Sequence, residues 1–385
     1  MSPIDPRQLI GPASPLGSPA PFWLLEVFKV LGFTLHQVPM HLWYAGLPLA
    51  ALLGLLPGEP ARRLRARLLG GMPLIVAAGI NLGIVPLLFT QVAYYRVFYP
   101  AGVLIAWPWF SVIVLLTVAY YAVYIAALGE RGGRRPRLAR AAVWVAALLF
   151  PAIGFIFANL FSLMTRLEAW PALAARTDAA GAVTGLALHT GDPTLLPRWL
   201  MLFGLALLTT AGFIVADAAI LSPPQGAGRA FTARVAGTAA TAGLAIFLVA
   251  GWRYAQTAPV DIPLFWRAPA AGLPAITWLL IVLQRGEIAR PLAVAAALVQ
   301  FAALGANAAA RQWLQNRELA RYLDLAAEPV RLEWSPLLLF LVLFVLGLVV
   351  VAWIASQMMA AVRMAADQPA RAGGSASPAG RRTTS

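Results

Sequence analysis

The sequence predicts an all-α, polytopic membrane protein built as a bundle of about nine transmembrane helices. Of its 385 residues, 61% are hydrophobic and 11% are charged, and the mean hydropathy is +0.76. Soluble domains carry about 25% charged residues, so this composition is typical of a chain that lies in lipid. The apolar runs are continuous rather than alternating, which favours helices over a closed β-barrel.

The individual spans follow from apolar windows that are bounded by charged or Pro/Gly-rich breaks. A helix needs roughly 20 apolar residues to cross a bilayer, and the seventh window is the shortest of the set. The predicted spans are residues 30–56, 71–95, 101–128, 139–164, 197–221, 232–252, 269–284, 290–310 and 336–358.

Basic residues gather on alternate loops of this arrangement. Arginine-rich segments occur at 61–67 and 131–140 and in the tail, whereas the intervening loops carry a more balanced charge. The positive-inside rule therefore predicts an N-terminus outside and a C-terminus in the cytoplasm, in the inner (plasma) membrane. The net charge of +14 is spread over these loops instead of one soluble face. We therefore expect a lipid bilayer as the surroundings and no nucleic-acid partner.

Three parts are expected along the chain. Residues 1–22 form a Pro-rich outside leader, 23–362 a single transmembrane helical domain, and 363–385 a basic, disordered cytoplasmic tail. The larger outside loops are 165–196 and 311–335. In the second loop, apolar and charged residues alternate near helical spacing from Trp313 to Leu323, which predicts an amphipathic helix on the membrane surface.

Most familiar catalytic patterns are missing from the sequence. It contains no P-loop, no dinucleotide glycine fingerprint, no GxSxG elbow and no HExxH helix, so soluble-type catalysis has no visible basis. Cysteine is absent, which excludes disulfides, thiolate catalysis, iron–sulfur clusters and covalent haem attachment within this chain. The candidates that remain are polar residues at membrane depth, where they are costly and therefore often functional.

Two histidines in the first predicted span are the first such candidates. His36 and His41 are five positions apart, which separates them by about 140° on a regular helix. Pro39 lies between them and can kink the segment, because it removes a backbone hydrogen bond. An imidazole nitrogen is a haem-iron ligand, so His36 is the possible iron ligand and His41 a further cofactor contact. The alternatives are a histidine hydrogen-bonded inside the bundle or one at the outer interface.

The second candidate site follows the second span. Gly79, Gly83 and Pro86 thin and bend that span, so that another helix or a planar cofactor can approach closely. Aromatic residues then cluster around Arg96, which could bind a haem propionate or a quinone headgroup. The alternative is an interfacial turn whose arginine reaches the lipid headgroups. The expected cofactor contacts are Arg96, Tyr95, Tyr99 and Trp107.

Three stretches, with the predicted topology, carry a resemblance to a known family. HQVPMHLWYAGLPLAALLGLL, NLGIVPLLFTQ and DPTLLPRWLMLFGLALLTTAGF resemble subunit I of the cytochrome bd quinol oxidases, over roughly residues 22–222. The resemblance implies that His36 is an axial ligand of a high-spin b haem. It places the family's second haem-ligating histidine near Met201, where the residue type has changed.

Other departures limit what the resemblance implies. The third span lacks membrane carboxylates, the eighth lacks a glutamate, and the connection between spans six and seven is too short for the family's quinol-binding loop. We therefore expect a relative that keeps the scaffold and one b haem or a quinone-like pocket. It would serve as a membrane subunit of a respiratory-type electron-transfer system with a redox or membrane partner subunit. The alternative is a redox-silent transporter, with Asp217 as a proton or ion site, or an assembly scaffold.

Overall fold

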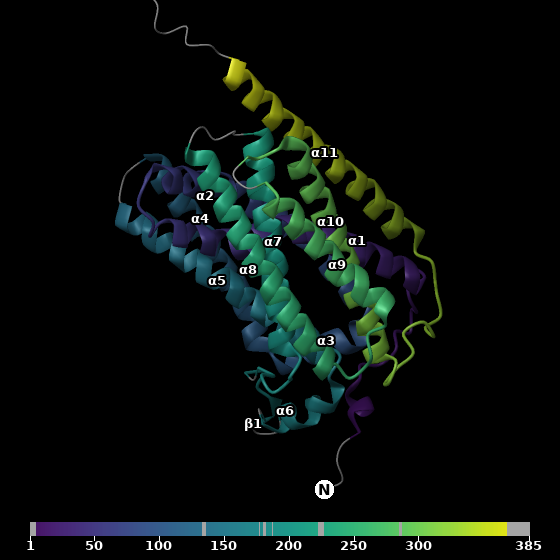
Figure 1. The fold of residues 1–385 in the computed structure, drawn as a ribbon. Helices are drawn as coiled ribbons and strands as arrows, with labels where there is room; N and C mark the ends of the chain where they lie inside the picture. The colour runs from purple at the N-terminus through teal and green to yellow at the C-terminus, as the bar shows by residue number, and fades with distance from the viewer. Residues whose placement is uncertain are drawn as a thin grey trace, which may run out of the picture. The chain divides into compact units, whose positions relative to one another are not determined.

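The computed structural model describes residues 5–132, 136–176, 178–179, 182–186, 188–221, 227–284 and 287–367, most of them helical (Figure 1). The chain divides into two units, Met1–Leu332 and Glu333–Ser385. The helices of the first unit are α1 (Phe22–Leu53), α2 (Glu59–Ala93), α3 (Tyr95–Leu104), α4 (Ala106–Gly132), α5 (Pro136–Leu163), α6 (Trp170–Arg176), α7 (Leu195–Ile220), α8 (Ala227–Thr257), α9 (Leu264–Val282) and α10 (Arg290–Leu319). The second unit contains α11 (Trp334–Asp367).

Short elements complete the first unit. Two 3-10 helices lie at Pro6–Leu9 and Leu167–Ala169. A small antiparallel pair, β1 (Asp178–Ala179) and β2 (Ala182–Val183), lies in the connection between α6 and α7.

Seven described helices are long and apolar enough to cross a membrane, namely α2, α4, α5, α7, α8, α9 and α10. This supports a helical membrane bundle, and each of the nine predicted windows overlaps a long helix. Two windows fall outside that set of seven. The α1 helix has 32 residues, but His36, Gln37 and His41 lower its hydropathy. In α11 the apolar stretch, Trp334–Val350, is shorter than the seven candidate spans. The nine-span count and the orientation stay predictions.

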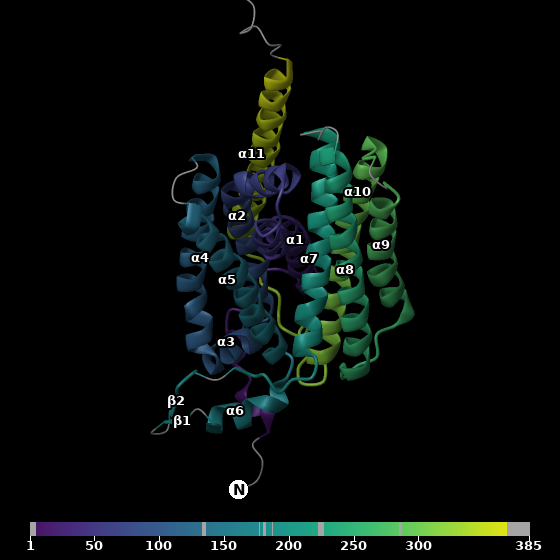
Figure 2. The same ribbon diagram turned by 60° about the vertical axis from the view of Figure 1, so that its left-hand side comes forward.

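The helix α1 lies at the centre of the first unit. It packs against α2, α5, α7 and α10, and its residues Ala45, Leu47 and Ala50 are fully buried. Figure 2 shows α4 and α5 on one side, α8, α9 and α10 on the other, and α1 and α7 between them.

Two glycines bring the backbones of α7 and α8 close together. A Cβ on Gly204 would lie 2.7 Å from the Gly243 carbonyl oxygen, and a Cβ on Gly243 would lie equally close to that of Gly204. Small residues allow such contact between backbones, which is how helices associate tightly in lipid.

A break between α2 and α4 moves the start of the third predicted span. Tyr94 and Ile105 leave helical geometry, with φ/ψ of −127/22° and −120/34°, and the short α3 lies between them. Its buried residues Val97, Phe98 and Leu104 join an apolar cluster with the end of α5 and with Trp170. The window expected at 101–128 therefore contains the end of α3 and most of α4.

The loop predicted at 311–335 is shorter in the structure, and its expected surface helix is replaced by a continuation of α10. That helix runs unbroken to Leu319, and Gln312, Leu314, Gln315 and Glu318 are buried rather than lying on a membrane surface. The apolar positions at helical spacing face the bundle because α1 and α7 both pack against α10.

The leader predicted at 1–22 is ordered where it is described. Residues 5–21 contain a 3-10 helix, and Ser18 forms a parallel bridge with Val330. Residues 1–4 of the leader lie outside the described residues. So do residues 368–385 of the predicted tail, whereas 363–367 belong to α11.

Candidate functional site

His36 points from α1 to the backbone of α2. Its Nδ1 lies 2.8 Å from the carbonyl oxygen of Gly79. A carbonyl only accepts hydrogen bonds, so Nδ1 carries the proton and Nε2 presents a lone pair. The ring rests against Gly83, where a Cβ would lie 2.8 Å from His36 Cε1, and Trp43 fills the space beside Gly79. The sequence predicts that Gly79 and Gly83 leave space for another helix or a planar cofactor. In the structure, side chains of α1 occupy the space beside both glycines.

His41 points instead toward α7 and is 0% exposed. Its Nδ1 lies 2.9 Å from Oγ1 of Thr209. That hydroxyl donates its own proton to the Leu205 carbonyl at 2.9 Å and also accepts from Gln300 Nε2 at 2.9 Å. Thr209 must therefore accept from His41, so the imidazole proton lies on Nδ1. Nε2 of His41 remains a buried lone pair with no hydrogen-bond partner in the described part of the chain.

The two imidazoles face different neighbours. His36 contacts α2 and His41 contacts α7, in keeping with the wide separation that their spacing predicts. Pro39 lies inside α1 without interrupting it, so the two rings do not converge on one ligand.

The structure does not bring Met201 to His36. Met201 lies on α7, partly buried, and a Cβ on Gly251 of α8 would lie 3.6 Å from its Cε. His36 faces α2 instead.

Arg96 and Tyr95 fasten the leader and the segment before α11. Arg96 Nε donates to the Gly11 carbonyl at 2.9 Å, and the Gly11 N–H donates to the Arg96 carbonyl at 2.8 Å. Tyr95 donates to Glu328 at 2.8 Å and accepts from the Ser14 N–H at 2.6 Å. Both predicted cofactor contacts therefore engage protein groups.

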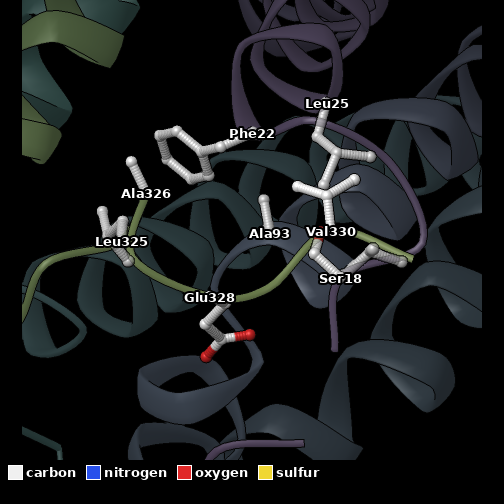
Figure 3. Close-up of a pocket in the computed structure, with 9 residues that line it drawn as sticks. Ser18, Phe22, Leu25, Ala93, Leu325, Ala326, Glu328 and Val330 are labelled. Carbon is white, nitrogen blue, oxygen red and sulfur yellow. The ribbon is translucent and has the colours of Figure 1, made fainter. Parts of the chain in front are cut away.

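Two of the aromatic residues expected around Arg96 are largely exposed. Tyr99 is 54% exposed and Trp107 is 63% exposed. The cavity beside Glu328, shown in Figure 3 between Phe22, Leu25 and Ala93, measures about 20 Å³. That is room for about one water molecule, not for a quinone ring.

A first buried polar network, which the sequence did not reveal as a unit, joins α1 to α10 through the end of α2. Tyr94 donates to Asn316 at 2.7 Å, and Gln312 donates to Glu26 at 3.0 Å and to Tyr94. Lys29 donates to Gln315 at 3.0 Å and lies 4.2 Å from the centre of the Tyr94 ring. These hydrogen bonds link three helices.

A second network joins the end of α5 to α7 and α10. The ion pairs are long: Arg166 Nε lies 3.5 Å from Asp192 Oδ1, and its Nη1 lies 3.6 Å from Glu318 Oε1. Arg198 Nη2 lies 3.9 Å from the other oxygen of Glu318 and donates to Tyr254 at 3.1 Å. The Glu318 side chain is only 1% exposed, so one carboxylate serves two guanidinium groups away from water.

Asp192 is held ionised within this network. Its burial opposes ionisation, but hydrogen bonds from Ser162 and from the Thr194 N–H, with the charge of Arg166, outweigh that effect and keep the pKa of Asp192 below its usual value. The same carboxylate accepts from the Thr194 hydroxyl at 2.8 Å. Asp192 thus caps the turn that leads into α7.

Asp217, the residue considered for ion transport, forms an ion pair. Arg67 Nε lies 2.9 Å from Oδ2, and Arg67 Nη2 lies 2.7 Å from Oδ1, a two-pronged contact between α2 and α7. A carboxylate used in this way joins two helices.

Metal-ligand clusters and known relatives give no further assignment. Among the described residues no group of three or more His, Cys, Asp or Glu side chains could hold a metal ion. Neither a family model nor a curated protein matches this chain.

Proposed function

We propose that this chain is a membrane-embedded subunit of a respiratory-type electron-transfer system, in which an imidazole of α1 holds a b-type haem. The observation that carries the proposal is Nε2 of His41, a completely buried lone pair without a partner among the described residues. Leaving a buried acceptor unsatisfied costs about 1–3 kcal/mol. A ligand that binds this nitrogen would remove that cost.

The chemistry of the two histidines fits haem ligation. Iron-binding histidines donate their other N–H to a protein acceptor, which fixes the tautomer and the ring orientation. Gly79 does this for His36 and Thr209 does it for His41. The resemblance to cytochrome bd subunit I favours His36 as the ligand, whereas the unpartnered nitrogen favours His41.

Bound haem would supply one-electron transfer. The chain itself would orient the imidazole through its Nδ1–H and exclude water by the apolar packing around α1. A redox partner subunit and the plasma membrane belong to the proposal, because one haem alone accepts and passes electrons only with a partner.

Two other predicted roles gain no support from the geometry. Quinone binding at Arg96 competes with the contacts of that residue to Gly11 and Glu328, and it stays a prediction from the sequence. Transport through Asp217 competes with its ion pair to Arg67.

The test is an absorbance spectrum of the detergent-purified protein, oxidised and then reduced with dithionite, with pyridine haemochrome quantification. We compare the wild type with His36→Ala, His41→Ala and His189→Ala. His189 is the matched control, because it is the third histidine and lies in the connection before α7. We expect b-type haem in the wild type and in His189→Ala, and its loss from one of the two α1 variants.

Folding of the variants is checked separately. A His→Gly variant that lost its haem should regain the spectrum when free imidazole is added, because the small molecule replaces the missing ligand. A colourless wild type after expression with ample haem, or haem retained by both α1 variants, contradicts the proposal and leaves a redox-silent scaffold as the reading.

A further inference from the structure

Arg311 differs from the other partly buried arginines of the first unit, because it has no acidic partner. It lies on α10, and its Cζ is 4.9 Å from the ring centre of Phe33 on α1 and 4.9 Å from that of Phe161 on α5. No hydrogen bond or ion pair joins it to any described residue. Aromatic faces attract a cation but accept N–H groups only weakly, so the five N–H donors of this guanidinium have no ordinary acceptor.

The charges around Arg311 add to this deficit. Its electrostatic neighbours include the cations Arg198 and Lys29. Each of those has an acid of its own nearby, since Arg198 lies beside Glu318 and Lys29 interacts with Glu26. Of these three cations, Arg311 is the one without an acidic partner among the described residues.

Two further donors lie in the same region, since Arg166, Arg198 and Arg311 are all electrostatic neighbours of Tyr254. Nη1 of Arg166 and Nε of Arg198 are buried and donate no hydrogen bond to any described residue. Both side chains are largely covered, with 8% and 16% exposed. Burying an unpaired charge and unsatisfied N–H groups is unfavourable, and a bound anion would reduce both penalties.

We propose that Arg166, Arg198 and Arg311, together called the arginine cluster, form a binding site for a singly charged oxyanion, a carboxylate or a phosphate group. A planar guanidinium fork matches two oxygens of such a group, which favours it over a spherical anion. A free carboxylate and a lipid phosphate share this chemistry, and the experiment below distinguishes the two sources. This site is independent of haem binding, since it involves neither histidine of α1.

The experiment measures the melting temperature of the detergent-purified full chain during titration with sodium formate, against sodium chloride at equal ionic strength. The variants are Arg311→Gln and the matched control Arg317→Gln. Arg317 lies on the same helix, is exposed, and also contacts an aromatic ring, with its Cζ 5.4 Å from the centre of Trp313. Arg311→Lys is included because lysine keeps the charge but lacks the fork.

We expect the melting temperature of the wild type to rise with the logarithm of formate concentration, and to rise more than in chloride. Arg317→Gln should behave like the wild type. Arg311→Gln should lose about tenfold or more in apparent affinity, because charge-assisted hydrogen bonds are lost, and Arg311→Lys should lie between. Arg311→Gln should fold, because the substitution removes an unpaired charge and strands no partner.

The source of the oxyanion is decided in lipid nanodiscs of phosphatidylcholine, with and without phosphatidylglycerol. If phosphatidylglycerol abolishes the formate response of the wild type, the site takes a lipid phosphate. If the response persists, the site takes a free carboxylate. Equal responses to formate and chloride, or equal responses of wild type and Arg311→Gln, overturn the proposal.

Discussion

The charged side chains at the two ends of α7 are paired in different ways. In its last turns, Asp217 receives Arg67 in a two-pronged ion pair with distances of 2.7 to 3.1 Å. In its first turn, Arg198 shares Glu318 with Arg166 at 3.9 and 3.6 Å. One end pairs Arg67 with one acid at close range, whereas at the other end two cations share Glu318 at longer range and Arg166 also lies 3.5 Å from Asp192.

Neighbouring groups repeat the difference. On the side of Asp217, Arg65 and Glu130 form a pair at 3.0 Å. On the side of Arg198, Arg311 contacts the rings of Phe33 and Phe161 and forms no ion pair with a described residue. The close pair at Asp217 joins two helices at hydrogen-bond distance, while the shared pairs at Glu318 are longer and match their guanidinium groups less completely. The comparison teaches that the function of this membrane protein is better sought where charges are incompletely matched.

The largest expected effect tests the shared acid. Glu318→Gln should lower the free energy of unfolding by about 3–5 kcal/mol, because two buried guanidinium groups lose their carboxylate. Unfolding by SDS titration of the reconstituted protein measures this, with the exposed Glu287→Gln as control. A change no larger than that of the control would mean that Glu318 does not balance the arginines.

A smaller effect is expected at the other end. Asp217→Asn should lower the free energy of unfolding by about 1–3 kcal/mol, since the pair is well made but the Arg67 side chain is 42% exposed. Glu59→Gln is the matched control, because Glu59 also binds arginines of α2 but is exposed. The comparison between the ends would be reversed if Asp217→Asn cost more than Glu318→Gln.

The smallest effect depends on pH. The pKa of Asp192 in the folded protein lies below its ordinary value of 3.8, so the unfolded chain binds the proton more readily. The stabilisation is therefore complete above pH 3.8 and is lost as the pH falls through the folded pKa. Melting temperatures measured from neutral to acid pH should show the gap between wild type and Asp192→Asn closing at the acid end. A gap independent of pH would contradict the ionised state of Asp192.

Much of the fold follows from local features of the sequence. Windows of continuous apolar residues located the long helices, because length and hydropathy suffice to mark a segment that can cross a membrane. The window that ends at residue 95 lies close to the break at Tyr94, but the break at Ile105 falls inside the next window, because α3 is apolar like the helices on either side of it. The continuation of α10 was also missed, because a helix with one polar face looks the same on a membrane surface and against a polar network.

The candidate site was predicted only in part. His36 and His41 stand out in the sequence because ionisable residues are rare at membrane depth. Their different partners, Gly79 and Thr209, were not foreseeable, because they come from separate helices. For the same reason Arg96 was assigned to a ligand, although it binds a leader residue 85 positions away.

The sequence by itself determined the class of the protein, the approximate course of its helices and the rarity of its membrane-depth histidines, because these depend on the chemistry of contiguous residues. Only the tertiary structure decided which polar atoms are satisfied and which are not. Nε2 of His41 and the N–H groups of Arg311 are left over because helices distant in the chain meet there, and their partners are fixed by packing rather than by sequence spacing.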